Sequence, residues 1–174
     1  MAVSLSTKVN HRLDLENQDR EALFVEVILQ HSTLLVCCTY CPPSLKEKLY
    51  MLLDSSLSVS LCKQYADVLV FGNFNAHIDW TLHADPIPHG RSDDLLLDVM
   101  TSANLVQACI EPTYSSLDRT PSSLELLLVV NPTRIISCLE SERLSNSGHR
   151  AIEVSCAAGL PQCGHHAFSS GNLT

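Results

Sequence analysis

The pattern of hydrophobic and polar residues predicts a chain made mainly of strands. Residues 23–30 alternate in part between apolar and polar side chains, and residues 33–40 are mostly β-branched or aliphatic. With His31-Ser32 between them, these segments predict two antiparallel strands joined by a tight hairpin. The second strand should stop at Pro42-Pro43, because proline has no backbone N–H to donate to a sheet.

Two further segments have apolar residues at helical spacing. Leucines recur at this spacing between residues 44 and 64, with Ser44 as a candidate N-cap, and we expect this helix to lie on a sheet. Ser92 is placed to cap a second helix, with Asp93 and Asp94 in its first turn, where acidic groups are favourable. The predicted buried side of the second helix consists of Leu95, Leu96, Val99 and Met100.

The rest of the chain predicts strands separated by turns and loops. Turns are predicted at 10–12 and 145–148, loops at 73–90 and 112–121, and strands at 67–71, 105–110, 124–130, 135–139 and 150–156. Strands outnumber helices, so the predicted fold class is α+β with layered sheets. We expect residues 1–20 to form an N-terminal strand and turn, residues 21–156 the domain, and residues 157–174 a flexible tail.

Composition and charge narrow the class of protein. The chain has 174 residues, of which 45% are hydrophobic and 5% aromatic, enough for one domain with an aliphatic core. No apolar run approaches the roughly 20 residues of a membrane-spanning helix, and the N-terminus lacks a secretory pattern. We therefore expect an intracellular protein of the cytoplasm or nucleus. The net charge of −8 argues against nucleic-acid binding by bulk electrostatics.

Eight cysteines are present, and most of them lie in apolar segments. We expect these to be buried free thiols in a reducing compartment, because buried cysteine behaves as a small hydrophobic residue. The cysteines in question are Cys37, Cys38, Cys62, Cys109, Cys138 and Cys156. A zinc site built from Cys38, Cys41, Cys163, His165 and His166 is the alternative. It is disfavoured because Cys38 lies in the middle of a predicted strand, whereas structural zinc ligands normally lie on tight turns.

The candidate chemistry is concentrated in residues 66–80. An apolar run at residues 68–71 predicts a buried strand that ends at Gly72, where the sequence becomes polar. This strand delivers Asn73 and Asn75 to a loop, and we expect Gly72 to let the backbone approach a ligand closely. Taken alone, the segment is equally compatible with an ordinary strand followed by a polar turn.

Five short motifs occur in an order that is typical of one enzyme family. They are Tyr40-Cys41-Pro42-Pro43, Gly72-Asn73-Phe74-Asn75-Ala76-His77, Pro112-Thr113, Ser123-Leu124-Glu125-Leu126 and Ser147-Gly148-His149-Arg150-Ala151. On these motifs the chain resembles the endonuclease/exonuclease/phosphatase superfamily, and more closely the endonuclease domain of LINE-type (non-LTR) retrotransposons. The resemblance implies a DNase I-like, two-sheet β-sandwich flanked by helices that cleaves DNA phosphodiesters with Mg²⁺ or Mn²⁺.

The resemblance also implies roles for four residues. Asn75 would bind the phosphate through its amide, and Tyr40 would donate its hydroxyl to the same phosphate. His149 would face the non-bridging oxygens as a hydrogen-bond donor or acid. Glu125 stands where a shorter aspartate normally orients that histidine.

Three positions depart from the family pattern. Asn73 replaces the carboxylate that activates water, and an amide cannot accept a proton at neutral pH. Gly148 replaces an aspartate that is a candidate metal ligand, and the extra methylene of Glu125 would displace His149 by about 1 Å. We therefore assign no metal ligand in this chain and expect catalysis to be impaired.

The motifs match the C-terminal part of the family's domain. The family's first half carries an asparagine and a glutamate that bind metal, and we expect neither in this chain, because Asn10 does not align with that asparagine. An incomplete second sheet would also leave apolar surface exposed.

Two functional hypotheses remain open. In the first, the chain is a retrotransposon endonuclease domain that once nicked DNA and is now inactive, with weak DNA binding because of its negative charge. In the second, it is a non-catalytic module that binds a protein partner without metal. Residual activity would require another carboxylate, such as Asp79 or Asp85, to substitute for the missing one.

Overall fold

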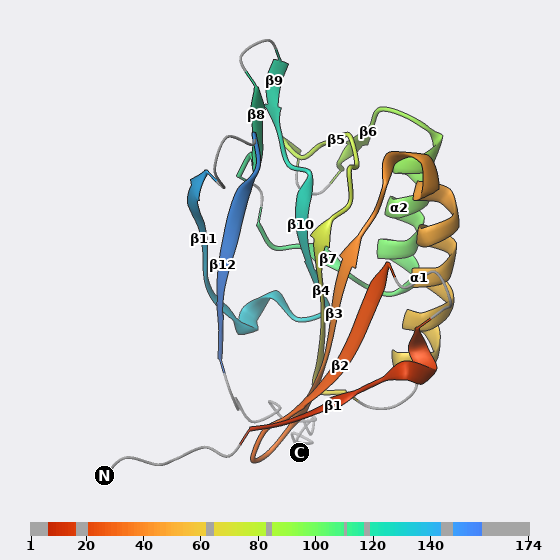
Figure 1. Ribbon diagram of the computed structural model, residues 1–174, viewed down its shortest axis with the longest axis vertical. Coiled ribbons are helices and arrows are strands. Elements are labelled where there is room, and N and C mark those ends of the chain that lie inside the picture. Colours follow the sequence, from red (N-terminus) through yellow and green to blue (C-terminus); the bar gives the residue numbers. More distant parts are fainter. Residues whose placement is uncertain are drawn as a thin grey trace, which may run out of the picture.

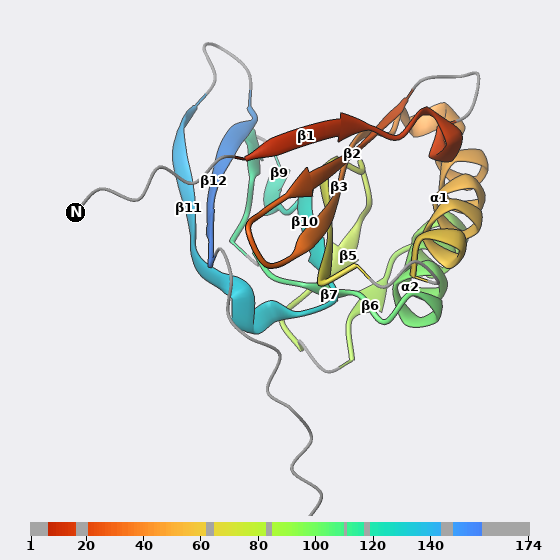
Figure 2. The same cartoon turned by 90° about the horizontal axis from the view of Figure 1, so that it is seen from below.

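The computed structural model describes residues 7–16, 21–61, 65–82, 85–109, 111–116, 119–143 and 148–157. Within them the chain folds into three layers, which are a pair of helices, a six-stranded central sheet and a two-stranded sheet on the opposite side (Figures 1 and 2). These layers form the α+β sandwich flanked by helices that the sequence predicts. Within the described part of the chain, no helix is long and apolar enough to cross a membrane.

The central sheet is mixed. Its strands lie in the order β1 (Lys8–His11), β2 (Ala22–Ile28), β3 (Thr33–Tyr40), β4 (Asp67–Asn73), β10 (Glu125–Val129) and β7 (Val106–Gln107). Neighbouring strands are antiparallel except β3 and β4, which are parallel because helix α1 (Lys46–Leu61) makes the crossover between them. The predicted hairpin is confirmed, since Ile28 pairs with Thr33 across the tight turn.

Both helices begin without the serine caps that the sequence predicts. A 3-10 turn, Pro43–Leu45, contains Ser44 and runs directly into α1. Helix α2 (Arg91–Ser102) follows Gly90, whose carbonyl accepts hydrogen bonds from the N–H groups of residues 93 (2.9 Å) and 94 (3.0 Å). The capping predictions are wrong because each helical turn starts before the serine, so that Ser44 and Ser92 already occupy helical positions.

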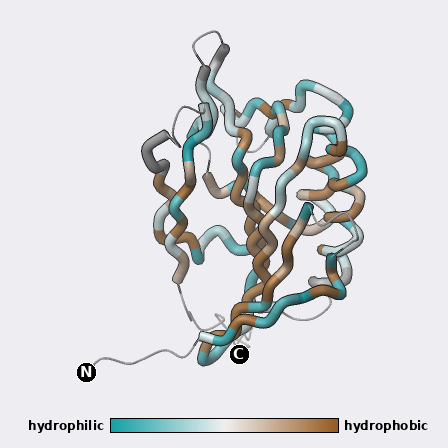
Figure 3. Tube along the Cα trace, in the orientation of Figure 1, coloured by the Kyte–Doolittle hydropathy of each residue, from teal (hydrophilic) through white to brown (hydrophobic). Residues whose placement is uncertain are grey.

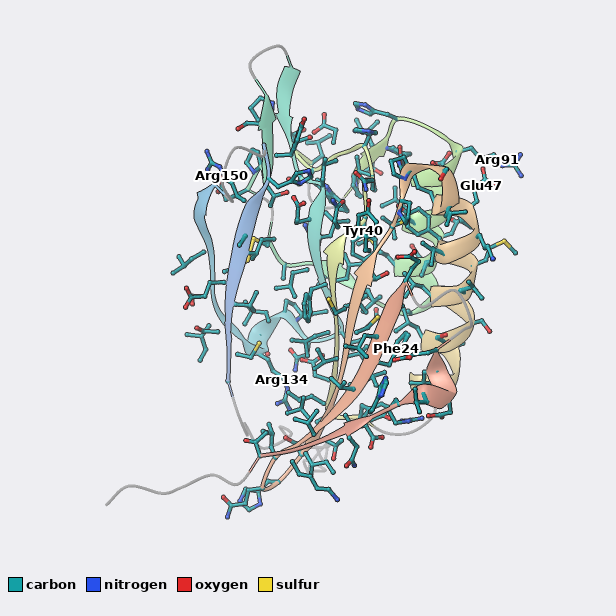
Figure 4. All side chains as sticks on the ribbon, in the orientation of Figure 1. Phe24, Tyr40, Glu47, Arg91, Arg134 and Arg150 are labelled. Atoms are coloured by element: carbon teal, nitrogen blue, oxygen red, sulfur yellow. A yellow bond between two sulfur atoms is a disulfide. The ribbon has the colours of Figure 1, made fainter. Side chains whose placement is uncertain are left out.

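The main core lies between the central sheet and the two helices. It contains Phe24, Leu35, Val68, Val70, Leu126 and Leu128 from the sheet and Leu49, Leu53, Leu57, Leu96, Val99 and Met100 from the helices. Figure 3 shows the hydrophobic residues gathered along the central strands, and Figure 4 places Phe24 between β2 and the helices. The predicted buried side of α2 is confirmed except for Leu95, which is half-buried.

A two-stranded sheet covers part of the opposite face. Its strands, β11 (Ile135–Arg143) and β12 (Arg150–Cys156), pack in a second apolar cluster with Leu69, Leu127 and Val129. A disulfide between Cys109 and Cys138, with Cα atoms 6.0 Å apart, joins the segment after β7 to β11. The disulfide therefore ties the two sheets together.

The prediction that all these cysteines are free thiols is wrong for the disulfide pair. The fold brings together two apolar segments whose cysteines are 29 positions apart in sequence. Cys37 is a buried free thiol, as predicted. Cys41, which the sequence placed only in the zinc alternative, is also buried and free, and burial raises the pKa of Cys41 to about 11. Cys38 is free but exposed, and Cys156 is free and half-buried. The other cysteine and histidine positions considered above, Cys62, Cys163, His165 and His166, lie outside the described residues.

Among the described residues, the β11–β12 sheet covers only part of one face of the central sheet and leaves the β2–β4 part of that face uncovered. Leu23, Cys38, Phe71 and Leu127 pair in register across β2, β3, β4 and β10 and so share this face. Leu127 is buried at 1% exposure, whereas Phe71 is 40% and Leu23 47% exposed. The exposed apolar surface that the sequence predicts is therefore located on β2–β4, beside the part that β11–β12 covers.

Several predicted segments have different boundaries. The strand expected at 105–110 is reduced to β7, and the strand expected at 135–139 continues to the end of β11. The two predicted loops contain short antiparallel ribbons, β5 (Ile78–Asp79) with β6 (Ile87–Pro88) and β8 (Tyr114–Ser116) with β9 (Arg119–Ser122). Most of the turn predicted at 145–148, the first six residues and the tail after 157 lie outside the described residues.

The turn predicted at residues 10–12 is wrong, because the first two of these residues belong to β1. Arg12 is buried, and its guanidinium donates to the carboxylates of Asp14 (2.7 and 2.8 Å) and Glu26 (2.7 Å) and to the hydroxyl of Tyr65. These partners compensate the charge of Arg12 away from water. A polar run that looks like an exposed turn is thus part of a buried network.

Candidate functional site

Three of the predicted site residues form a row across the central sheet. Tyr40 pairs with Asn73 across the parallel strands β3 and β4, and Asn73 pairs with Glu125 across β4 and β10. Residues paired in register lie on the same face of a sheet. Side chains alternate along β10, so this is the face of Leu127, against which β11 and β12 pack. Tyr40 is half-exposed at the upper end of β3 in Figure 4.

Gly72 is required by the packing of β4 on β3. Its φ of +147° is one that residues with a Cβ rarely adopt, and a Cβ there would lie 1.8 Å from the carbonyl oxygen of Thr39. The close approach expected at Gly72 is therefore to the neighbouring strand and not to a ligand. The sequence could not distinguish these two reasons for a glycine.

The loop that contains Asn73 and Asn75 is held by hydrogen bonds of these two side-chain amides. Asn73 Oδ1 accepts a hydrogen bond from the backbone N–H of Asn75 (2.9 Å), and Asn75 Nδ2 donates to the carbonyl of Cys41 (2.8 Å). Asn75 has a φ of +50°, in the left-handed region that asparagine tolerates better than most residues. The Cys41 N–H in turn donates to the Asn73 carbonyl (2.8 Å). Asn73 thus serves as a structural acceptor at the position where the family has its carboxylate.

His149 and Glu125 are in direct contact. His149 Nδ1 lies 2.6 Å from Glu125 Oε1, and because an ionised carboxylate has no proton, the imidazole donates. The His149 side chain is one-third exposed, whereas the other oxygen of Glu125 is buried and has no hydrogen-bond partner among the described residues. The longer acidic side chain therefore reaches the histidine that the resemblance pairs with it.

Gly148, the residue before His149, is packed against β8. The ring of Tyr114 lies 4.8 Å from the ring of His149, between centroids, and the Ser115 N–H donates to the Gly148 carbonyl (3.0 Å). A Cβ on Gly148 would lie 2.7 Å from Cε2 of Tyr114 and 2.8 Å from the carbonyl oxygen of Ser115. There is no room at this position for the aspartate of the family pattern unless β8 moves.

A cleft of about 950 Å³ adjoins the histidine. Asn75 and His149 line it, and so do His77 and His89 from the β5–β6 ribbon and Tyr114 from β8. The sequence alone implied no role for these last three residues. The unusual number of histidines in the predicted loop at 73–90 was the available signal for two of them.

The two candidate substitute carboxylates are in different places. Asp79 lines the cleft, and its Oδ1 accepts a hydrogen bond from the Thr81 N–H (2.9 Å), which lowers the pKa of Asp79. Asp85 instead borders a separate hollow of about 680 Å³ beside α2 and β7. Of these two, Asp79 is therefore the one that lines the same cleft as His149 and Asn75.

The donors at the site do not fit the divalent metal that the resemblance implies. Mg²⁺ requires a near-octahedral set of oxygen ligands. Glu125 Oε1 is engaged with His149, Asn73 Oδ1 with the Asn75 backbone and Asp79 Oδ1 with the Thr81 backbone, which leaves Glu125 Oε2 as a buried oxygen without a partner in the described part of the chain. Across the described residues, no three histidine, cysteine, aspartate or glutamate side chains come together in a way that would hold an ion. We therefore derive no catalytic step through a metal.

Comparisons with known proteins agree with this fold. A family model described as endonuclease-reverse transcriptase matches residues 34–153. The endonuclease domain of TRAS1, a telomere-specific non-LTR retrotransposon, is similar with a TM-score of 0.68 and 14% identity, over 88% of this chain and 68% of that one. The catalytic domain of Xenopus laevis APE2 is similar with a TM-score of 0.52 and 15% identity, over 78% of this chain and 57% of that one.

These likenesses show the DNase I-like fold of endonuclease/exonuclease/phosphatase proteins. None of the curated protein sequences matches the chain. The family model covers well over half of the residues, including every described strand from β4 to β11 and all but the first residue of β3. The chain therefore belongs to the endonuclease-reverse transcriptase family.

Proposed function

We propose that this chain is an endonuclease-type domain that binds a phosphodiester backbone without hydrolysing it. Its ancestral reaction, on this proposal, is the nicking of DNA to prime reverse transcription. Family membership and the likeness to the TRAS1 endonuclease domain support that origin. The loss of hydrolysis is argued from the site itself.

The observation that carries the proposal is the environment of Asn73. Its Oδ1 accepts the Asn75 N–H at 2.9 Å, and its neighbour in register on β10, Glu125, holds the imidazole of His149 at 2.6 Å. Hydrolysis needs a group that accepts a proton from water, and an amide oxygen does not do so at neutral pH. The carboxylate of Glu125 beside it is held by His149 through Oε1, and its other oxygen is buried. The site therefore keeps its binding groups and lacks a base.

Asn75 and His149 are the groups that would contact a phosphate. One hydrogen of Asn75 Nδ2 is used by the Cys41 carbonyl, which fixes the amide plane and leaves its second hydrogen for an anion. Glu125 orients the ring of His149 at the border of the same cleft. With a net charge of −8 on the chain, we expect such binding to be weak and strongly reduced by salt.

Plasmid nicking tests the loss of hydrolysis. Wild-type protein and His149→Ala are incubated with supercoiled DNA in Mg²⁺ or in Mn²⁺, and we expect equal, background rates of nicking. Wild-type nicking above the His149→Ala background would show that another base, with Asp79 the first candidate, completes the site. Calorimetry with Mg²⁺ on the same proteins is expected to show no binding.

Fluorescence anisotropy with a short labelled duplex at low salt tests the binding role. We expect Asn75→Ala and His149→Ala each to weaken binding by about 10-fold to 100-fold, as the loss of one hydrogen bond to a charged group does. His31→Ala is the matched control, since His31 is exposed in the β2–β3 turn at the other end of the sheet. Equal affinity in all four proteins would contradict the assignment of these two residues.

A second candidate function is a protein-binding module that keeps the fold. The uncovered face of Leu23, Cys38 and Phe71 favours it, because contiguous exposed apolar residues mark interaction surfaces. Self-association is the simplest form of this function. Sedimentation of the wild type and of Phe71→Ser at rising concentration is expected to show association only in the wild type, and monomers in both would remove the support for this function.

A further inference from the structure

We propose that Thr113 is a positioning residue of the candidate site, which holds Glu125 and the start of the His149 strand in one arrangement. The inference rests on the proposed function, because it concerns the same pair of side chains. Thr113 belongs to the Pro112-Thr113 motif, and its side chain is completely buried, with 0% exposure. It accepts hydrogen bonds from backbone N–H groups, so we argue its effect on the site through the backbone.

Thr113 bonds to the chain next to both members of the pair. Its Oγ1 accepts hydrogen bonds from the backbone N–H groups of Leu124 and Glu125, both at 3.0 Å. Its carbonyl accepts the N–H of Arg150 at 2.8 Å, one residue beyond His149. Figure 4 places Arg150 at the upper end of β12, on the same side of the molecule as Tyr40. Thr113 thus links the start of β10 to the start of β12 through hydrogen bonds.

The start of β10 depends on this side chain because, among the described residues, no strand pairs with that edge. Strand β7 pairs only with Leu128 and Val129, near the far end of β10. Nearer the site, side-chain oxygens replace the missing strand, since Gln107 Oε1 accepts the Leu127 N–H at 2.9 Å. Thr113 Oγ1 does the same for the two N–H groups at the start of the strand. A hydroxyl suits this task, because its oxygen has two acceptor lone pairs.

Losing the Thr113 hydroxyl would leave two buried N–H groups without an acceptor. Buried backbone N–H groups are almost always paired, so the start of β10 would move to find water or another partner. Glu125 carries one of these N–H groups, and its carboxylate lies at the end of a flexible side chain. A shift of its backbone would therefore loosen the 2.6 Å contact with His149 Nδ1.

Exchange of the His149 Nδ1 proton with water, followed by NMR, tests the inference. The proton is protected while it is bonded to Glu125. Thr113→Val keeps the shape of the side chain but not its oxygen, and we expect its His149 Nδ1 proton to exchange at least about 10-fold faster than in the wild type. We expect the same acceleration in Glu125→Ala. Thr113→Ser, which keeps the oxygen, is expected to retain wild-type protection. Thr101→Val on the exposed end of α2 is the control for removing a threonine hydroxyl.

Three outcomes separate the possibilities. Loss of protection in Thr113→Val with rescue in Thr113→Ser supports the positioning role. Wild-type protection in Thr113→Val, with loss in Glu125→Ala, overturns the role of Thr113 and leaves the proposed function intact. If the His149 Nδ1 proton of Glu125→Ala exchanges as slowly as in the wild type, Glu125 and His149 do not form the described hydrogen bond. Both the positioning role of Thr113 and the proposed function are then contradicted.

The wild type supplies a further measurement that does not depend on whether Thr113→Val folds. The backbone N–H groups of Leu124 and Glu125 are expected to exchange at least about 100-fold more slowly than in an unstructured chain, because both donate to a buried oxygen. Fast exchange of both groups would overturn the inference.

Discussion

The two ends of strand β4 carry similar residues and do different work. Asp67 begins the strand and Asn73 ends it. At the first end an acidic side chain is buried, and at the other an amide occupies the position where the resemblance implies a carboxylate that acts as the base. Figure 4 shows the separation, with Arg134 near the first end and Tyr40 near the second.

At the Asp67 end the carboxylate supports the fold. Its Oδ1 accepts the N–H groups of Val68 (2.8 Å) and Asn131 (3.1 Å), and its Oδ2 lies 3.7 Å from Nε of the buried Arg134. Burial raises the pKa of Asp67, which shows how costly its charge is there. The hydrogen bonds and the nearby guanidinium compensate that cost.

At the Asn73 end the fold needs only a hydrogen-bond acceptor. The amide oxygen of Asn73 accepts the N–H of Asn75 as a carboxylate oxygen would. The loop therefore keeps its geometry with an amide in place of the carboxylate. An amide does not, however, accept a proton from water at neutral pH. An amide thus satisfies the backbone of this loop as a carboxylate would, and on the proposed function this is how the site keeps its shape without its base.

The largest expected effect is at Asp67. Asp67→Ala leaves Arg134 buried without a counter-charge and removes the acceptor of two N–H groups, so we expect it to lower the free energy of unfolding by about 3–5 kcal/mol. Urea unfolding measures the change. Asp85→Ala, at an exposed position, is the control and is expected to change the same quantity by less than about 0.5 kcal/mol. Equal losses in the two variants would contradict the structural role of Asp67.

The next effect is at Gly72. Gly72→Ala places a methyl group against the Thr39 carbonyl at a φ of +147°, and strain of this kind costs about 1–3 kcal/mol before any displacement of β3. Gly90→Ala is the matched control. Its Cβ would meet only Asp93 Oδ2, at an ordinary 3.8 Å, so it is expected to leave the thermal midpoint nearly unchanged. A stable Gly72→Ala protein would show that β3 and β4 are not packed as described.

The two reversions toward the family pattern should differ in cost. Gly148→Asp must displace Tyr114 and the Ser115 carbonyl, and overpacking of this kind costs about 1–3 kcal/mol. Asn73→Asp keeps the acceptor for the Asn75 N–H and is expected to cost about 1 kcal/mol or less. Chemical unfolding of both single variants measures the difference. A Gly148→Asp protein as stable as Asn73→Asp would mean that β8 yields easily.

The smallest effect is a pH dependence at Glu26. Hydrogen bonds from Tyr65 and Arg12 hold the pKa of Glu26 below its ordinary value of 4.5. A carboxylate whose pKa is lower in the folded state stabilises the protein above the unfolded pKa, and this contribution is lost as the pH falls through the folded pKa. We expect the unfolding free energy of the wild type to fall below about pH 4.5 and Glu26→Gln to remove part of that fall.

Unfolding curves between neutral pH and pH 3 check this prediction. Glu47→Gln, on the exposed side of α1, controls for the removal of one negative charge. If Glu26→Gln and Glu47→Gln have the same acid dependence, the network around Arg12 does not contribute through Glu26.

The elements that depend on local pattern were predictable. The β2–β3 hairpin, the end of β3 before the two prolines, the leucine side of α1 and strand β12 all follow from residues within about ten positions of one another. The serine caps and the turn at residues 10–12 were predicted wrongly, because alternative local partners satisfied the backbone. Arg12 is buried only because Glu26 and Tyr65 reach it from elsewhere in the fold.

For the candidate site, the sequence by itself determined which residue types are present and in which order, and hence the family and the amide in place of a carboxylate at Asn73. The tertiary structure decided which contacts these site residues make. Strand register placed Tyr40, Asn73 and Glu125 in one row, and the packing of β12 brought His149 to Glu125, 24 residues away. Register and packing depend on the burial of a whole sheet face, which no short segment encodes.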